Sequence, residues 1–174
     1  QLGISVSSAG DVNGDGYSDV ILGANQYDNG STDEGGAFVY HGSSTGLSTT
    51  PNWMAESNQA SAAFGIAVAS AGDVNGDGYS DVIVGARLYD NGTTDEGSAY
   101  VYYGSASGVN SGTAGTPLNS AWYGESNQTG SEYGSWVATA GDVNADGYSD
   151  IIVSAWSYDN GLADEGMAYV YHGS

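Results

Sequence analysis

The chain has 174 residues and is strongly acidic, with 21 Asp and Glu against one basic residue and a formal net charge of −20. This charge argues against nucleic acid as a partner, because phosphate binding needs Lys and Arg, and against docking on anionic membranes. No cysteine is present, so disulfide bonds are excluded, and no apolar run approaches the ~20 residues of a membrane span. Because the first residue is Gln1 rather than Met, we expect a processed chain or a piece of a longer one.

One unit occurs three times along the chain. It opens with an apolar or aromatic residue and a glycine, followed by a segment with β-branched residues at alternate positions, as in a strand. An acidic loop comes next, and then a short β-branched apolar run typical of a strand buried on both faces. A second loop containing Asn-Gly predicts a hairpin to a half-buried strand of small and aromatic residues. A Gly/Ser/Thr-rich connector leads to a fourth strand that begins with Trp. In the first unit the strands are expected at 4–11, 20–24, 37–42 and 53–56, with the two loops at 10–19 and 27–35.

These units predict an all-β fold. Four strands in an antiparallel meander, repeated along a chain, are typical of β-propeller blades. No segment has the 3.6-residue apolar period and the caps of a helix, so essentially no helix is expected. We interpret residues 1–174 as a single propeller segment with repeats at 1–62, 63–131 and 132–174.

The third repeat ends after its third strand, which leaves eleven expected strands and an incomplete third blade. Propellers close with typically about four to eight blades, so three blades predict a partial propeller. Either the chain is part of a longer propeller, or a second copy completes the ring. We favour the longer propeller.

The acidic loop reads GDVNGDGYSD at 10–19 and at 72–81, and GDVNADGYSD at 141–150. Its oxygen-bearing side chains stand at alternate positions, a spacing that suits Ca²⁺, which takes about six to eight oxygen ligands. Positions in the loop are counted from its first aspartate, which is Asp11 in the first copy. An EF-hand is the rival interpretation, but it needs a bidentate Glu at position twelve, where Leu22 stands in the first copy. The ninth position is therefore expected to close the cage, with the backbone carbonyl of the seventh. We predict three Ca²⁺ sites, made by Asp11, Asn13, Asp15, Tyr17 and Asp19; by Asp73, Asn75, Asp77, Tyr79 and Asp81; and by Asp142, Asn144, Asp146, Tyr148 and Asp150.

The glycine at the sixth position of each loop permits the positive φ that the curled backbone requires. The fourth position is Gly14, Gly76 and Ala145 in the three copies, from which we expect it to tolerate a Cβ atom. The alternative is a set of Asx-rich turns without an ion. We consider it the weaker interpretation, because three carboxylates in one turn repel each other unless a cation is present.

These motifs resemble the FG-GAP repeat of integrin α subunits and of many secreted bacterial proteins. The resemblance is carried by Phe64-Gly65, by the DVNGDGYSD loop and by Gly85-Ala86. It departs from the family where Asn25, Arg87 and Trp156 replace the proline of the GAP motif. The resemblance implies a propeller whose Ca²⁺ loops join the first and second strands on one face. It also implies that ligands use the opposite face, which would carry the YDNG loops and the ESNQ segments that begin at Glu56 and Glu125.

The main functional hypothesis is a non-enzymatic extracellular or cell-surface scaffold for adhesion or recognition, stabilised by calcium. The alternatives are a carbohydrate-binding module, or a structural surface or filament subunit that assembles through its open blade edges. An enzyme is not expected, because His41 and His172 share a strand position that is Tyr103 in the second repeat, which indicates a strand surface. The partner would be a protein or glycan ligand, with no nucleic acid and no membrane insertion.

Ligand contacts are expected where the repeats differ most. Asn25, Arg87 and Trp156 occupy one such position and are the candidates for binding. The alternative is that Trp156 and Trp136 fill space between blades.

Overall fold

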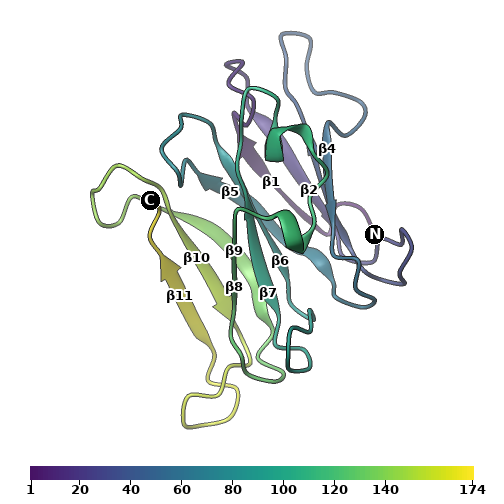
Figure 1. The fold of residues 1–174 in the computed structure, drawn as a ribbon, viewed down its shortest axis with the longest axis vertical. Helices are drawn as coiled ribbons and strands as arrows, with labels where there is room; N and C mark the ends of the chain where they lie inside the picture. Colours follow the sequence, from purple (N-terminus) through teal and green to yellow (C-terminus); the bar gives the residue numbers. More distant parts are fainter.

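The computed structural model describes residues 1–174 and contains eleven strands and no α-helix (Figure 1). The strands form three antiparallel meanders in sequence order, two with four strands and one with three. This confirms the predicted all-β fold with an incomplete third blade. Blade 1 contains β1 (Ser5–Gly10), β2 (Asp19–Ala24), β3 (Gly36–Tyr40) and β4 (Trp53–Glu56); blade 2 contains β5 (Phe64–Gly72), β6 (Asp81–Ala86), β7 (Ser98–Tyr102) and β8 (Trp122–Glu125); blade 3 contains β9 (Tyr133–Gly141), β10 (Asp150–Ala155) and β11 (Met167–Tyr171).

The three blades are stacked face to face, with blade 2 between the other two (Figure 1). Each blade buries one apolar face against the next, which gives two separate cores. The core between blades 1 and 2 contains Phe64, Tyr100 and Tyr102, and Tyr133 is buried in the core between blades 2 and 3. Stacking is the only way for a one-sheet repeat to bury its apolar residues, so the blades depend on each other for stability.

The strands of blade 2 are more deeply buried than their counterparts. All six residues of β6 and all five of β7 are buried. In β2 and β10, by contrast, two residues each are only half-buried. The prediction that the apolar run is buried on both faces is therefore correct for blade 2, which has a neighbour on each side.

The loop between the second and third strands differs from the prediction. We name these segments the DEG loops, at residues 25–35, 87–97 and 156–166. The strands do form a hairpin, but Asn-Gly is not its two-residue turn. Instead the buried Glu34 carboxylate accepts the Asn29 amide at 2.6 Å, and Asp28 Oδ1 accepts the Asp33 amide at 2.6 Å. Hydrogen bonds from its own carboxylates to its backbone amides thus fix the conformation of this long loop.

The connector after β7 contains the two short helices of the structure, the 3₁₀ segments η1 (Val109–Gly112) and η2 (Pro117–Asn119). The expectation of essentially no helix is thus correct for α-helix, while these turns were missed. The connector packs back on blade 1, where Thr113 O accepts the Trp53 indole N–H at 2.8 Å and the Gly115 amide donates to Met54 O at 2.8 Å. This part of the connector therefore lies along the outer edge of blade 1, beyond β4. None of the helices is long and apolar enough to span a membrane.

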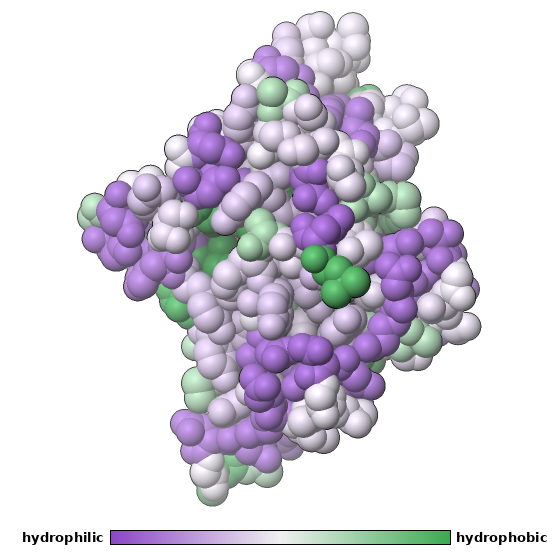
Figure 2. All heavy atoms as spheres, viewed as in Figure 1, coloured by the Kyte–Doolittle hydropathy of each residue, from purple (hydrophilic) through white to green (hydrophobic).

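The surface is predominantly polar. Figure 2 shows hydrophilic residues concentrated over the loops at the margins, with apolar residues in smaller patches. This distribution agrees with the acidic composition, because the acidic loops and the DEG loops contain most of the Asp and Glu residues.

Candidate metal-binding loops

Each acidic loop joins the first and second strands of its blade and curls around its own carboxylates. In the first loop Asp11 accepts three backbone amides, from Gly14 at 2.7 Å, Asp15 at 3.1 Å and Gly16 at 2.8 Å. Asp15 Oδ1 in turn accepts the Tyr17 amide at 2.9 Å. Gly16 has φ +88°, as the sequence predicts, and the second loop repeats these bonds within 0.1 Å. The loop conformation is therefore encoded within its own residues.

The ninth residue of the loop ties it to the end of the third strand. Asp19 is buried, and its two oxygens accept the amides of Val12 and Gly42, both at 2.8 Å. Asp81 accepts the Val74 and Gly104 amides at 2.9 and 2.8 Å in the same way. Sequence reasoning assigned this Asp to the metal cage and missed its structural role. The glycine two residues after each third strand could have indicated it, because its amide is the second donor.

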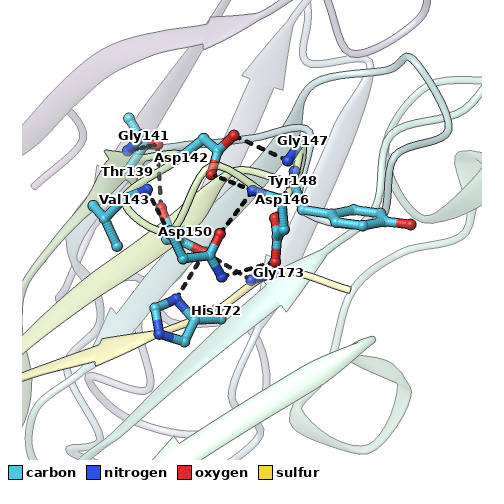
Figure 3. Close-up of polar contacts among 11 residues, drawn as sticks. Thr139, Gly141, Asp142, Val143, Asp146, Gly147, Tyr148, Asp150, His172 and Gly173 are labelled. Carbon is cyan, nitrogen blue, oxygen red and sulfur yellow. Dashed lines mark hydrogen bonds and ion pairs between the residues drawn. The ribbon is translucent and has the colours of Figure 1, made fainter.

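The ninth residue of the third loop is bonded in the same way, with one addition (Figure 3). Asp150 accepts the Val143 amide at 2.8 Å and the Gly173 amide at 3.0 Å, and His172 Nδ1 lies 3.3 Å from Asp150 Oδ1. In blade 1 the equivalent His41 has its Nδ1 3.3 Å from Asn13 Nδ2. The two histidines therefore contact the acidic loops, a placement that their interpretation as strand-surface residues did not include.

The ninth residues differ in their ionisation. The pKa of Asp81 is raised to about 7, mainly by burial, although its two amide donors lower it; the carboxylates of Asp77 and Asp73 add a smaller upward contribution. Burial also disfavours ionisation of Asp150, but the two amides and His172 outweigh it and hold the pKa of Asp150 below its usual range. A negative charge at Asp81 is therefore disfavoured mainly by burial, and the carboxylates of Asp77 and Asp73 add to this effect.

The donor set of the loops fits a hard cation in its chemistry, because every predicted ligand atom is an oxygen. A nearby cation would favour the ionised form of Asp81, which burial and the carboxylates of Asp77 and Asp73 disfavour. The side chains are not arranged as a cage in this structure, since no group of three or more His, Cys, Asp or Glu is placed to hold a metal ion. The amides described above occupy the carboxylates instead, so the three calcium sites stay a prediction.

Adjacent acidic loops are bonded to each other across the blades. Between the first and second loops, the Ser80 amide donates to Asp11 O at 3.0 Å and Ser80 Oγ accepts the Asp11 amide at 3.2 Å. Ser149 and Asp73 make the same pair of bonds between the second and third loops, at 2.8 and 3.2 Å. The three loops thus form one continuous row along the stack.

The tyrosine of each following loop packs over the fourth residue of the preceding one. A Cβ atom on Gly14 would lie 2.6 Å from Tyr79 Cε1, and one on Gly76 would lie 2.6 Å from Tyr148 Cε1. The expectation that this position tolerates a Cβ atom is therefore wrong for the first two loops. Ala145 keeps the positive φ of its counterparts, at +61°, but belongs to the last blade of the stack.

Comparison with known protein families identifies the repeat. The FG-GAP repeat matches at residues 2–40, 64–102 and 133–171.

The chain belongs to the FG-GAP repeat family.

The curated relatives contain this segment within much longer proteins. The chain is 34% identical over 148 residues to integrin alpha-6 of Gallus gallus, covering 84% of the chain and 13% of that protein. It is 29% identical over 174 residues to integrin alpha-5 of Xenopus laevis, covering 98% of the chain and 16% of the integrin. It is also 31% identical over 179 residues to phosphatidylinositol-glycan-specific phospholipase D of Mus musculus, covering 99% of the chain and 20% of that protein. The chain therefore spans a fifth or less of the length of these relatives.

The glycines that name the FG-GAP repeat meet at the blade interfaces. A Cβ atom on Gly23, in the GAP position of blade 1, would collide with the carbonyl oxygen of Gly65, in the FG position of blade 2. Gly85 and Gly134 make the same contact between blades 2 and 3. The backbones of adjacent blades are thus in direct contact at these positions. The GAP position of the first two repeats must therefore be glycine, because a Cβ atom would occupy the space of the next blade's FG glycine.

The candidate ligand residues of this FG-GAP chain have different surroundings. Asn25 is half-buried, and Arg87 Nη1 forms an ion pair at 3.1 Å with Glu132 of the next repeat. Trp156 is 50% exposed and packs edge-on against Trp136, with ring centroids 6.4 Å apart. Trp136 is 65% exposed, so within this chain the pair does not fill a space between blades.

At the opposite end of the blades, the ESNQ segments and the DEG loops are hydrogen-bonded to each other. Gln59 of the first ESNQ segment exchanges two hydrogen bonds with the backbone of Asp90, at 2.9 and 2.7 Å. Asn29 Nδ2 donates to Glu56 Oε2 at 2.7 Å. These polar residues, which the resemblance places on the ligand-binding face, therefore also connect the DEG loops to the outer strands.

Proposed function

We propose that this chain is part of a calcium-stabilised β-propeller that serves as an extracellular or cell-surface scaffold for adhesion or recognition. The observation that carries the proposal is the row of three acidic loops, which share one conformation and are bonded in series across the blades. The similarity to two integrin alpha chains supports a recognition role. The partner would be a protein or a glycan bound at the end of the blades that carries the DEG loops.

Calcium would act by electrostatics. Bound by the Asp and Asn side chains and the tyrosine carbonyl of each loop, it would cancel the repulsion among the carboxylates. Because Ser80 and Ser149 bond each loop to its neighbour, the stabilisation would extend to the blade interfaces. Extracellular calcium modules bind with Kd values on the order of 10⁻⁴–10⁻³ M, a range suited to calcium outside the cell.

Thermal unfolding with and without calcium tests the proposal. We expect EDTA to lower the Tm by roughly 5 °C or more and millimolar Ca²⁺ to restore it, because a ligand that binds only the folded state stabilises it. Asp15→Asn and Asp77→Asn should weaken this response, whereas Asp33→Asn, in a DEG loop, should leave it intact. A Tm that EDTA and Ca²⁺ leave unchanged would contradict the calcium mechanism.

A second candidate is an accessory segment of an enzyme. It is favoured by the similarity to phosphatidylinositol-glycan-specific phospholipase D, which extends over nearly the whole chain. We expect no cleavage of a phosphatidylinositol-glycan substrate by residues 1–174 alone, because most carboxylates of the acidic loops and the DEG loops accept backbone amides. Turnover by the purified chain that survives in Asp15→Asn would contradict a non-enzymatic scaffold.

A further inference from the structure

A turn of blade 2 inserts an aliphatic side chain between blades 1 and 2. Val109 is fully buried in the first core, although it belongs to the connector and not to a strand. The turn from Gly104 to Val109 positions it: the Gly108 amide donates to Ser105 O at 2.7 Å, and Ser105 Oγ donates to Gly108 O at 2.7 Å. The Asn110 amide then donates to Tyr103 O at 2.7 Å. The interface between blades 1 and 2 therefore contains Val109 of the connector in addition to the strand residues of both blades.

Blade 1 has the same turn, with the sequence Gly-Ser-x-x-Gly-aliphatic, and it forms without a blade to pack against. The Gly46 amide donates to Ser43 O at 3.0 Å, and Ser43 Oγ donates to Gly46 O at 2.7 Å. The Ser48 amide donates to His41 O at 2.9 Å, and Leu47 occupies the position of Val109 with half of its surface exposed. The turn is thus a preformed element that presents an aliphatic side chain.

The interface between blades 2 and 3 contains a cavity of about 70 Å³ at the equivalent place. Five of its apolar lining residues are the counterparts of residues that share the first core with Val109. The lining residues are Val74, Val101, Trp122, Ile151 and Tyr171, and their counterparts are Val12, Val39, Trp53, Val82 and Tyr102.

Gly173 and Ser174 also line this cavity and start the same turn. The Ser174 amide donates to Val74 O at 2.9 Å, as the Ser105 amide donates to Val12 O at 3.0 Å. The cavity and the Val109 site therefore share five equivalent apolar lining residues and the backbone hydrogen bond that starts the turn. They differ in that the Val109 side chain occupies the site between blades 1 and 2.

We propose that this cavity is a binding site for an aliphatic side chain, of valine or leucine, presented by a Gly-Ser-x-x-Gly-aliphatic turn that begins at Gly173 and Ser174. Ser149 and His172 also line the cavity, but six of its ten lining residues are hydrophobic, and this apolar surface favours an aliphatic occupant. A carboxylate is disfavoured, because burying a charge costs free energy unless the charge is paired and hydrogen-bonded.

Grafting the turn of blade 2 onto blade 3 tests this site. Residues Ala106–Asn110 are copied after Ser174, and the Tm is measured in saturating Ca²⁺, so that the outcome is independent of the calcium hypothesis. Burial of one valine should raise the Tm by roughly 3–10 °C relative to the 174-residue chain. The matched control carries Asp in place of the grafted Val and should show no gain. Equal Tm values for the two grafts would overturn the proposal.

Two further measurements locate the effect. The indole N–H resonance of Trp122 should shift with the valine graft and not with the aspartate graft, since Trp122 lines the cavity. In the unextended chain, Val109→Ala should lower the Tm by a comparable amount, because it empties the equivalent site. A gain in Tm that leaves the Trp122 resonance unmoved would place the valine elsewhere and overturn the assignment.

Discussion

Blade 2 has a neighbour on both faces, whereas blade 3 has one on a single face within residues 1–174. In β7 all five residues are buried, but in β11 exposed residues alternate with half-buried ones. The two strands have almost the same sequence, SAYVY and MAYVY. Their burial is therefore decided by the position of the blade in the stack and not by the strand itself.

The sequence of blade 3 differs where the first two blades receive the next one. The GAP glycines Gly23 and Gly85 correspond to Ser154, and the loop glycine Gly76 corresponds to Ala145. Trp136 likewise stands where blade 2 has the buried Ala67. At the glycine positions even a Cβ atom would lie within 3 Å of the next blade, so the contacts of the first two interfaces leave no room for the side chains of Ser154 and Ala145. A blade that stacks on blade 3 would therefore make a contact at Ser154 different from the glycine contacts of the first two interfaces.

The largest expected effect comes from exchanging the GAP residues of blades 2 and 3. Gly85→Ser places a Cβ atom against the Gly134 carbonyl and should lower the free energy of unfolding by roughly 3–4 kcal/mol, measured by chemical denaturation. Ser154→Gly should change it by less than about 1 kcal/mol. Equal losses in the free energy of unfolding for Gly85→Ser and Ser154→Gly would contradict the inference that the contact with the next blade makes Gly85 sensitive to substitution.

The second comparison concerns pH in the presence of EDTA. The pKa of Asp81 is raised to about 7 from an ordinary value of 3.8, so the folded state binds its proton more tightly than the unfolded state. The free energy of unfolding should therefore fall as the pH rises from about 4 to 7, by roughly 1 kcal/mol for each pH unit. Asp81→Asn should flatten this dependence in denaturation curves recorded at several pH values.

Asp150 supplies the opposite sign. Its pKa is lowered, so its stabilising contribution is present above the ordinary pKa and is lost as the pH falls through the folded value. Asp150→Asn should therefore reduce acid sensitivity below about pH 4. If the free energy of unfolding depended on pH in the same way in Asp81→Asn and Asp150→Asn, the opposite pKa shifts of the two aspartates would be ruled out.

A smaller effect than that of Gly85→Ser is expected at the fourth position of the acidic loops. Gly14→Ala adds a Cβ atom against the Tyr79 ring and should cost about 1–3 kcal/mol. The reverse change, Ala145→Gly, removes a side chain at positive φ and should stabilise by about 0.5–1 kcal/mol. Both are measured by urea denaturation, and a destabilising Ala145→Gly would show that Ala145 makes a contact of its own.

Much of the fold was predictable because its signals are local. The alternation of apolar residues marked each strand, and the loop glycine Gly16 has the positive φ that its position in the curled loop predicts. The candidate site was only partly predictable. The backbone-binding role of Asp19 was missed, since one of its donors, Gly42, lies 23 residues away. The Asn-Gly signal indicated the hairpin but not the loop that the buried Glu34 holds open.

The sequence by itself determined the repeat, the strand order, the blade count and the curled acidic loops, because these depend on residues a few positions apart. Only the tertiary structure decided which glycines are indispensable, how the loops are linked in a row, and where Val109 is buried. Those features depend on contacts between blades, such as Ser80 with Asp11, in which residues about one repeat apart in sequence meet. Three nearly identical repeats thus acquire different roles from their neighbours in the stack.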